Sequence, residues 1–518
     1  MQASSSNRPT THYGRGAAIG LAIALLAAML IAINPVGYIG GHWDDGRYLA
    51  TAQLWATHGP QLGHDHWALR ATVVGPAAIA IKLFGDTRPA LMLPGLLLLV
   101  ALLAVQFAAA WRAFGLAVAS IATLALVTTP AILFAATRLT ADLTETLFWA
   151  LALWSYWFAG TATRHQRLWL LATGLATGLA FATRETAVGL CLVLALGWVK
   201  GWRSDRLPRR VYGWIALGFA AVALPELISF ALASGDAFYR VRVDLAHVKI
   251  ASTNLDGLTF AGHQVLLNPE LMSRWHGAGP IRLHWAIDPW LNLFANPGYG
   301  LGFAATALAV LAAFRRAPSA PLRALCGPLV AVIVIQVAVV LYVIATDPKP
   351  RMFMPSLLPA ALLFALAAQS LGTNRAGRAL VAALLASKLI LTFIAVDFAP
   401  AQPDVAAQAA TALALADGPV HVSRWTRSQL ALAPASVTDR LTTAPPLADT
   451  LALTIERPGD DDDGVHAATD TLLWRSPPGR APLSVRAMQV LGVPVTATIA
   501  LSSQRRTPTV NLYRRGAN

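Results

Sequence analysis

The sequence is poor in charged residues. Only 13% of its 518 residues are Asp, Glu, Lys or Arg, and 56% are hydrophobic, whereas soluble domains carry about 25% charged residues. This shortage excludes an ordinary soluble globular protein. Long apolar runs recur between residues 17 and 396, and each approaches the roughly 20 residues that a helix needs to cross a bilayer. We therefore predict an all-α polytopic membrane protein with about eleven transmembrane helices.

Cysteine is nearly absent. The two cysteines, Cys191 and Cys326, both lie within predicted spans, so we expect no structural disulfide. A cleavage site of small residues is also missing after the first apolar run, at about residues 16–38. Because further spans follow, we interpret this run as the first transmembrane helix and not as a signal peptide that is removed.

Acidic residues are scarce as well, with 26 against 40 basic residues and a net charge of +14. A basic excess can indicate nucleic-acid binding, but here much of it lies in short loops between spans, where the positive-inside rule explains it without nucleic acid. This pattern predicts a cytoplasmic N-terminus. The bases of the predicted inner loops are Arg112, Arg164, Arg167, Lys200, Arg203, Arg206, Arg209, Arg210, Arg315, Arg316, Arg323, Arg375 and Arg378; the outer acids include Asp44, Asp45, Asp65, Asp86, Asp236, Asp244, Asp256, Asp288 and Asp347.

The same pattern divides the chain into three parts. We predict a cytoplasmic tail at 1–15, a transmembrane domain at 16–396 with outer loops at 40–90 and 234–298, and a soluble domain at 397–518. Within the first outer loop we expect irregular polar chain to about residue 70 and then, at 73–84, a short helix lying at the membrane interface.

The soluble domain is predicted to be a small α/β unit on the periplasmic side. A helix-like stretch at 404–416 precedes strand-like stretches at 420–425, 471–474, 487–491 and 510–513. The acidic run at 460–463 lacks the ligand spacing of a calcium loop, so we interpret it as solvated chain. The alanine- and leucine-rich composition suggests a bacterial inner (cytoplasmic) membrane protein.

Charged residues gather where the predicted spans meet the outer face. A charge at membrane depth marks a functional site unless another reason is found, and five separate segments bring acids and bases to this one face. The candidate site residues are Asp44, Asp45, Arg47 and Tyr48; His64, His66 and Arg70; Arg138, Asp142 and Glu145; Arg184 and Glu185; and Lys349 and Arg351.

The order of these segments resembles the glycosyltransferase family 39 group, which includes protein O-mannosyltransferases and aminoarabinose transferases. The resemblance covers residues 1 to about 370 and rests on the Asp44-Asp45 pair, the stretch 81–94, the stretch 138–142 opening a span, the stretch 174–186 and the stretch 349–355. It implies the GT-C membrane fold. It also implies a polyprenyl-phosphate-linked sugar as donor and an inverting transfer outside the cytoplasm.

The resemblance and the chemistry together suggest roles. By the resemblance, Asp44 is the general base for an acceptor hydroxyl, and Asp45 orients the acceptor or the base, although family members often carry Glu at this second position. Asp142 would support hydroxyl groups. Lys349 and Arg351, followed by Arg184, are suited to hold the donor phosphate through charge-assisted hydrogen bonds. We expect no cofactor, with a divalent metal at His64 and His66 as the alternative.

Several candidates have a structural alternative. Asp44, Asp45 and Asp142 suit helix N-caps, Arg184 and Glu185 suit a local ion pair, and Lys349 and Arg351 suit contacts with lipid headgroups. Gly174 and Gly178 indicate close helix packing. Lys388, in the middle of the last span, has no assigned role.

Two functional alternatives are also open. One is a transporter or lipid-linked sugar flippase without transferase activity, although no internal repeat supports it. The other is a non-catalytic subunit of an envelope-assembly complex. The sequence does not identify the sugar or decide whether the acceptor is a lipid, a glycan or a protein.

Overall fold

The computed structural model describes most of the membrane part and the helices and strands of a C-terminal sheet unit. The described residues are 10–33, 44–161, 164–200, 207–244, 246, 290, 293–294, 297–340, 350–398, 403–423, 426–427, 430, 433, 435–444, 450–456, 470–477, 483–492 and 509–516. Lys349, most of the predicted outer loop 234–298 and the acidic run 460–463 lie outside them.

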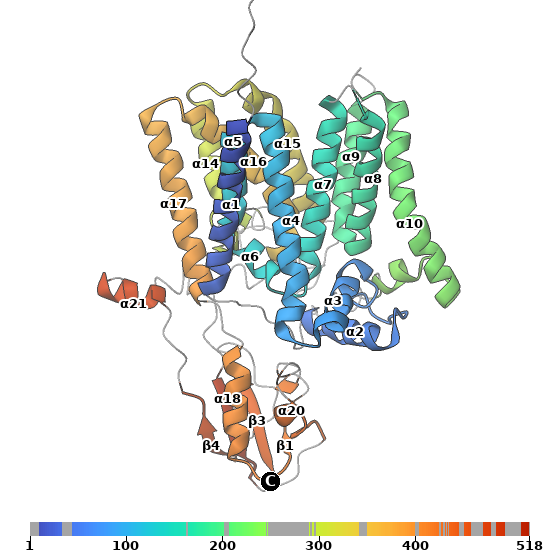
Figure 1. Ribbon diagram of the computed structural model, residues 1–518, viewed down its shortest axis with the longest axis vertical. Helices are drawn as coiled ribbons and strands as arrows, with labels where there is room; N and C mark the ends of the chain where they lie inside the picture. Colours follow the sequence, from blue (N-terminus) through green and yellow to red (C-terminus); the bar gives the residue numbers. More distant parts are fainter. Residues whose placement is uncertain are drawn as a thin grey trace, which may run out of the picture.

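The membrane part is a bundle of helices that run side by side (Figure 1). Six described helices are long and apolar enough to cross a membrane, or up to seven if the bent pair α5 (Leu116–Val127) and α6 (Pro130–Ala136) forms one span. The prediction of a polytopic helical membrane protein is confirmed. The upright helices are α1 (Thr10–Ile33), α4 (Arg88–Phe114), α5 (Leu116–Val127), α7 (Ala141–Thr161), α8 (Gln166–Thr183), α9 (Val188–Lys200), α10 (Gly213–Ser234), α14 (Gly302–Phe314), α15 (Ala320–Ala338), α16 (Leu357–Leu371) and α17 (Arg375–Phe398).

Helix α16 forms the centre of one half of this bundle. Its apolar residues continue around the whole helix, which is typical of a helix enclosed on every side, and nearly all of them are buried against α5, α14 and α15. In the other half, α8 and α10 approach closely. A Cβ atom on Gly174 would lie 2.0 Å from the Ile215 carbonyl oxygen, so glycine permits this contact, as predicted.

Helices α2 (Asp44–His58) and α3 (Ala71–Phe84) lie at one end of the bundle, below it in Figure 1. The short helix predicted at 73–84 is present. The prediction of an irregular polar loop is wrong for residues 44–58, because these form α2. Only a narrow stripe of α2, Tyr48, Leu49 and Ala52, is buried against α3, and this stripe is too sparse to stand out among the polar residues.

The C-terminal unit lies at the same end of the bundle and has the predicted α/β composition (Figure 1). Its five strands are ordered β2-β1-β3-β5-β4, parallel from β2 to β3 and antiparallel from β3 to β4. The predicted strand at 487–491 is wrong, since most of it belongs to helix α21. The elements are α18 (Pro403–Ala414), β1 (Val420–His421), α20 (Ala435–Thr438), β2 (Leu441–Thr442), β3 (Leu451–Glu456), β4 (Thr471–Arg475), α21 (Leu483–Val490) and β5 (Thr509–Arg514).

Candidate functional site

The two adjacent aspartates open helix α2, where the partial positive charge of a helix N-terminus favours carboxylates. Their side chains differ in surroundings. Asp44 is partly exposed and forms an ion pair with Arg351, which lies in the short helix η7 (Pro350–Ser356) before α16. Asp45 is 3% exposed. The ion pair between Asp44 and Arg351 joins two residues that are 307 positions apart in the sequence.

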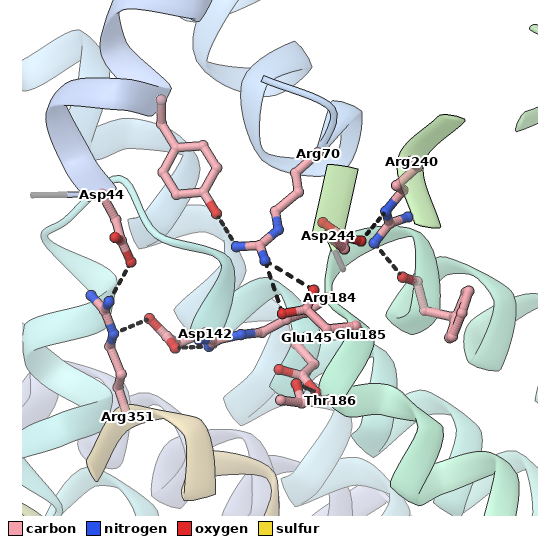
Figure 2. A network of polar contacts seen from close by, with 12 residues as sticks. Asp44, Arg70, Asp142, Glu145, Arg184, Glu185, Thr186, Arg240, Asp244 and Arg351 are labelled. Atoms are coloured by element: carbon pink, nitrogen blue, oxygen red, sulfur yellow. Dashed lines mark hydrogen bonds and ion pairs between the residues drawn. The ribbon is translucent and has the colours of Figure 1, made fainter. Parts of the chain in front are cut away.

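A second carboxylate meets the same arginine (Figure 2). Asp142, in the first turn of α7, lies with its Oδ2 atom 4.0 Å from Arg351 Nε. Its Oδ1 atom accepts a hydrogen bond from Arg184, and both side chains of this ion pair are about 95% buried, with 4% and 5% of their surface exposed. Arg351 therefore lies between Asp44 and Asp142, and Asp142 lies between two guanidinium groups.

Arg70 organises a third group of contacts beside these two. Its Nη1 atom donates to the Tyr48 hydroxyl at 2.7 Å, and its Nη2 atom lies 3.0 Å from Glu185 Oε2. Arg70 is 3% exposed, so a buried cation is balanced by one carboxylate and one phenol oxygen, as buried charges require. This arrangement connects α2, the start of α3 and the turn after α8.

The pairings of Arg184 and Glu185 follow from the backbone between α8 and the short helix η1 (Glu185–Ala187). Arg184 has extended angles, φ −160° and ψ 142°, and successive side chains of an extended segment point in opposite directions. Arg184 therefore contacts Asp142, and Glu185 contacts Arg70 (Figure 2). The alternative of a local ion pair between these two neighbours is wrong.

Glu145 extends the polar cluster into the bundle. It is fully buried, one turn after Asp142 on α7, and its Oε1 atom accepts a hydrogen bond from the Thr186 hydroxyl at 2.6 Å. A buried carboxyl that is paired with a hydroxyl and not with a cation is expensive to keep charged. In Figure 2 it lies just below Arg184, beside Thr186.

The two aspartates of α2 differ in acidity. Burial raises the pKa of Asp44, but the positive charges of Arg351, Arg184 and Arg70 outweigh burial and hold it well below its usual range. Burial raises the pKa of Asp45 to about 7, against the opposing effects of Arg138 and Arg351. Asp44 is therefore ionised at neutral pH, whereas Asp45 keeps its proton to a higher pH than a free aspartate does.

Other candidates from the first outer loop lie around this cluster and not within its ion pairs. Arg47 is exposed, with its guanidinium carbon 5.6 Å from the Trp67 ring centre. His64 is exposed, whereas His66 is buried, with its ring centre 3.6 Å from that of Trp67. Among the described residues, no three His, Cys, Asp or Glu side chains gather closely enough to hold a metal ion.

A further arginine cluster was not predicted from the sequence. Arg240 Nη1 lies 2.8 Å from Glu226 Oε1, its Nε lies 3.5 Å from Asp244 Oδ2, and its Nη2 donates to the Phe181 carbonyl oxygen at 2.8 Å. Two signals point to this cluster: Glu226 is an acid within an apolar span, and Arg240 and Asp244 have the i, i+4 spacing of a helical ion pair. Figure 2 shows Arg240 and Asp244 of this cluster near Glu185.

Lys388, for which the sequence predicted no role, forms a hydrogen bond within the bundle. Its side chain is 2% exposed in α17, and its Nζ atom donates to the Gly300 carbonyl oxygen at 3.0 Å. This bond connects the last span to the turn before α14. Lys388 therefore helps to hold these parts of the bundle together.

Comparison with known proteins agrees with this architecture. Residues 76–228 match the family model described as dolichyl-phosphate-mannose-protein mannosyltransferase, and this segment includes Arg138, Asp142 and Arg184. No curated protein sequence matches the chain.

Two crystal structures show the same fold. One is ArnT from Cupriavidus metallidurans bound to undecaprenyl phosphate, with 16% identity, a TM-score of 0.52 and coverage of 84% of this chain and 92% of that chain. The other is the apo oligosaccharyltransferase of Archaeoglobus fulgidus, with 13% identity, a TM-score of 0.50 and coverage of 83% and 64%. The predicted resemblance to GT-C membrane glycosyltransferases is confirmed.

Proposed function

We propose that this chain transfers a sugar from a polyprenyl-phosphate-linked donor to an acceptor hydroxyl at the membrane surface, with inversion at the anomeric carbon. The observation that carries the proposal is the convergence of Arg70, Arg184 and Arg351 with carboxylates at one end of a GT-C bundle. The family model matched by residues 76–228 is described by a dolichyl-phosphate sugar donor, and the similar ArnT structure holds undecaprenyl phosphate.

Arg351 is the residue best placed to receive the donor phosphate. It is 26% exposed, so a ligand can reach it, whereas Arg184 is 5% exposed. A guanidinium group binds phosphate through two parallel hydrogen bonds. When the glycosyl–phosphate bond breaks, the leaving phosphate gains about one negative charge, and fixed guanidinium groups stabilise a charge that develops during the reaction.

The ion pair between Arg351 and Asp44 sets the order of the steps in the transfer. A phosphate bound to Arg351 competes with Asp44 for the same guanidinium, and an Asp44 carboxylate that is released from this pair becomes more basic. It then takes the proton of the acceptor hydroxyl. The acceptor oxygen bonds to the anomeric carbon on the face opposite the phosphate, and the carbon–oxygen bond to phosphate breaks, which releases polyprenyl phosphate.

Asp45 and Asp142 have supporting roles in this scheme. Asp142 holds Arg351 and Arg184 in place and offers its oxygens to sugar hydroxyls. Asp45, adjacent to the base, orients the acceptor or the base. The scheme needs no cofactor, because the arginines supply the positive charge. Lys349 is proposed as an additional phosphate contact from its position two residues before Arg351 in the sequence.

The distribution of basic residues supports a periplasmic site in a bacterial inner membrane. The end of the bundle opposite α2 and α3 holds the turns α4–α5, α14–α15 and α16–α17 and the described ends of the α7–α8 and α9–α10 connections (Figure 1). These turns carry most of the bases that were predicted to face the cytoplasm, including Arg112, Arg167 and Arg315. By the positive-inside rule the site and the C-terminal unit then face the periplasm.

The test is transfer by purified protein in liposomes that contain a polyprenyl-phosphate sugar, with mass spectrometry of lipids, glycans and peptides as the readout. Loss of a general base lowers the rate by about 10²–10⁴-fold, so Asp44→Asn should reduce transfer to that extent. Asp86→Asn is the matched control, because Asp86 is an exposed aspartate in the turn after α3. Full transfer by Asp44→Asn would exclude Asp44 as the base. Movement of the donor across the bilayer without transfer would favour the transporter alternative.

A further inference from the structure

Helix α21 presents an apolar face that the described part of the chain does not cover. Leu483, Val490 and Leu491 are 47%, 87% and 76% exposed. Leu483 and Val490 are seven residues apart, which is about two helical turns, so they share one face. The backbone N–H of Leu491 donates to the Ala487 carbonyl oxygen at 3.0 Å, so Leu491, directly after the last residue of α21, borders the same face.

The start of α21 is fixed to the end of the last span. The Asp397 carboxylate accepts hydrogen bonds from the backbone N–H groups of Leu483 at 3.1 Å and Ser484 at 2.6 Å, and from the Ser484 hydroxyl. A carboxylate at a helix N-terminus is a stable cap. Because Asp397 lies at the last turn of α17, this cap holds α21 at the depth where that span leaves the bilayer.

The direction of α21 suits the membrane surface. In Figure 1 it lies crosswise to the bundle helices, beside the lower end of α17 and apart from the C-terminal sheet. Arg486 is exposed on this helix, one turn from Leu483 and Val490, where it can reach anionic lipid headgroups. Exposed apolar side chains beside a basic residue, on a helix parallel to the surface, are typical of an interfacial helix.

We propose that α21 lies in the membrane surface, with Leu483, Val490 and Leu491 immersed among the headgroups and upper acyl chains. The occupant of this face is the lipid bilayer, because the Asp397 cap sets its depth. The C-terminal unit is then attached to the membrane at two points, the end of α17 and α21. This inference does not depend on the chemistry of the site, and it would stand if the transferase proposal failed.

The experiment measures the depth of single labelled positions in the full chain. Cys191 and Cys326 are both free and can be replaced by alanine, after which one cysteine is introduced at Val490 or Leu491 and labelled with the fluorophore NBD. Leu415, which is 61% exposed just beyond the end of α18, is the matched control, because it is apolar and exposed but belongs to the sheet unit. The labelled proteins are reconstituted in phosphatidylethanolamine–phosphatidylglycerol liposomes.

The expected result is blue-shifted NBD emission at positions 490 and 491, with quenching by nitroxide lipids at about 5–10 Å below the headgroups. The Leu415 position should keep the emission of a label in water. Asp397→Ala, which removes the cap, should shift the emission at 490 back toward that of water. Three outcomes would overturn the proposal: a water-like label at 490 and 491, equal quenching at 415, or a blue shift that grows with protein density, which would indicate a second copy on this face.

Discussion

The buried ion pair between Arg184 and Asp142 allows a quantitative test of the cluster. Arg184→Met removes the guanidinium and leaves an Asp142 carboxylate that is 4% exposed. Breaking a buried pair from one side costs about 3–5 kcal/mol. Because Arg351 Nε remains 4.0 Å from Asp142, we expect the lower limit, about 3 kcal/mol of unfolding free energy.

A double variant separates the interaction free energy of the pair from the effect of each residue alone. Arg184→Met combined with Asp142→Leu replaces both charges by apolar side chains, and such a replacement is often neutral or stabilising by about 1–4 kcal/mol. We therefore expect the double variant to be more stable than Arg184→Met alone, with a coupling free energy of about 3 kcal/mol. Equilibrium unfolding in mixed micelles of the unchanged protein, Arg184→Met, Asp142→Leu and the double variant measures this coupling free energy. Additive effects of the two single substitutions would refute the pairing. Transfer should stay lost in the double variant, because its recovered stability does not restore the charges.

Two further predictions concern acidity and packing. The pKa of Asp45 is raised from 3.8 to about 7, so the folded chain holds a proton that the unfolded chain releases; stability should fall as the pH rises through this interval, by on the order of 4 kcal/mol. Unfolding at pH 5 and pH 8 should therefore show a larger stabilising effect of Asp45→Asn at pH 8, and an equal effect at both would contradict the shift. Gly174→Ala should lower stability by about 1–3 kcal/mol, since its Cβ would lie 2.0 Å from the Ile215 carbonyl oxygen, whereas Gly75→Ala, with nothing within 4 Å, should not. Equal thermal midpoints for the two variants would show that α8 and α10 are not in close contact.

The bundle could be predicted from the sequence because a bilayer constrains it strongly. A span needs a long apolar run, and such runs stand out even where their ends are uncertain. Helix α2 could not be predicted in this way. Its buried apolar residues are only Tyr48, Leu49 and Ala52, and Asp44, Asp45 and Gly46 at its start resemble a turn. What identifies α2 is the packing of these apolar residues against α3, and this contact is visible only in the structure.

The gathering of these charged residues could also be predicted, but not their pairing. Their position at the outer ends of spans selected Asp44, Arg70, Asp142, Arg184 and Arg351, and the structure joins all five in ion pairs. Which acid meets which base depends on backbone direction at single residues. The extended backbone at Arg184 sends this side chain to Asp142 and its neighbour Glu185 to Arg70, although adjacency in the sequence had suggested a local pair.

Because Asp44 pairs with Arg351, the arrival of the donor can change the strength of the proposed base. Asp44 is a weak base while Arg351 is bound to it, because its pKa is held low. Under the proposed mechanism, the donor phosphate takes Arg351 and the pKa of Asp44 rises, so base strength increases when the donor arrives. The pKa of Asp45 would also rise when the donor phosphate takes Arg351, since Arg351 is one of the charges that lower it. An acceptor hydroxyl would then be activated only beside a bound donor, and water that enters the empty site would meet an Asp44 that is still paired.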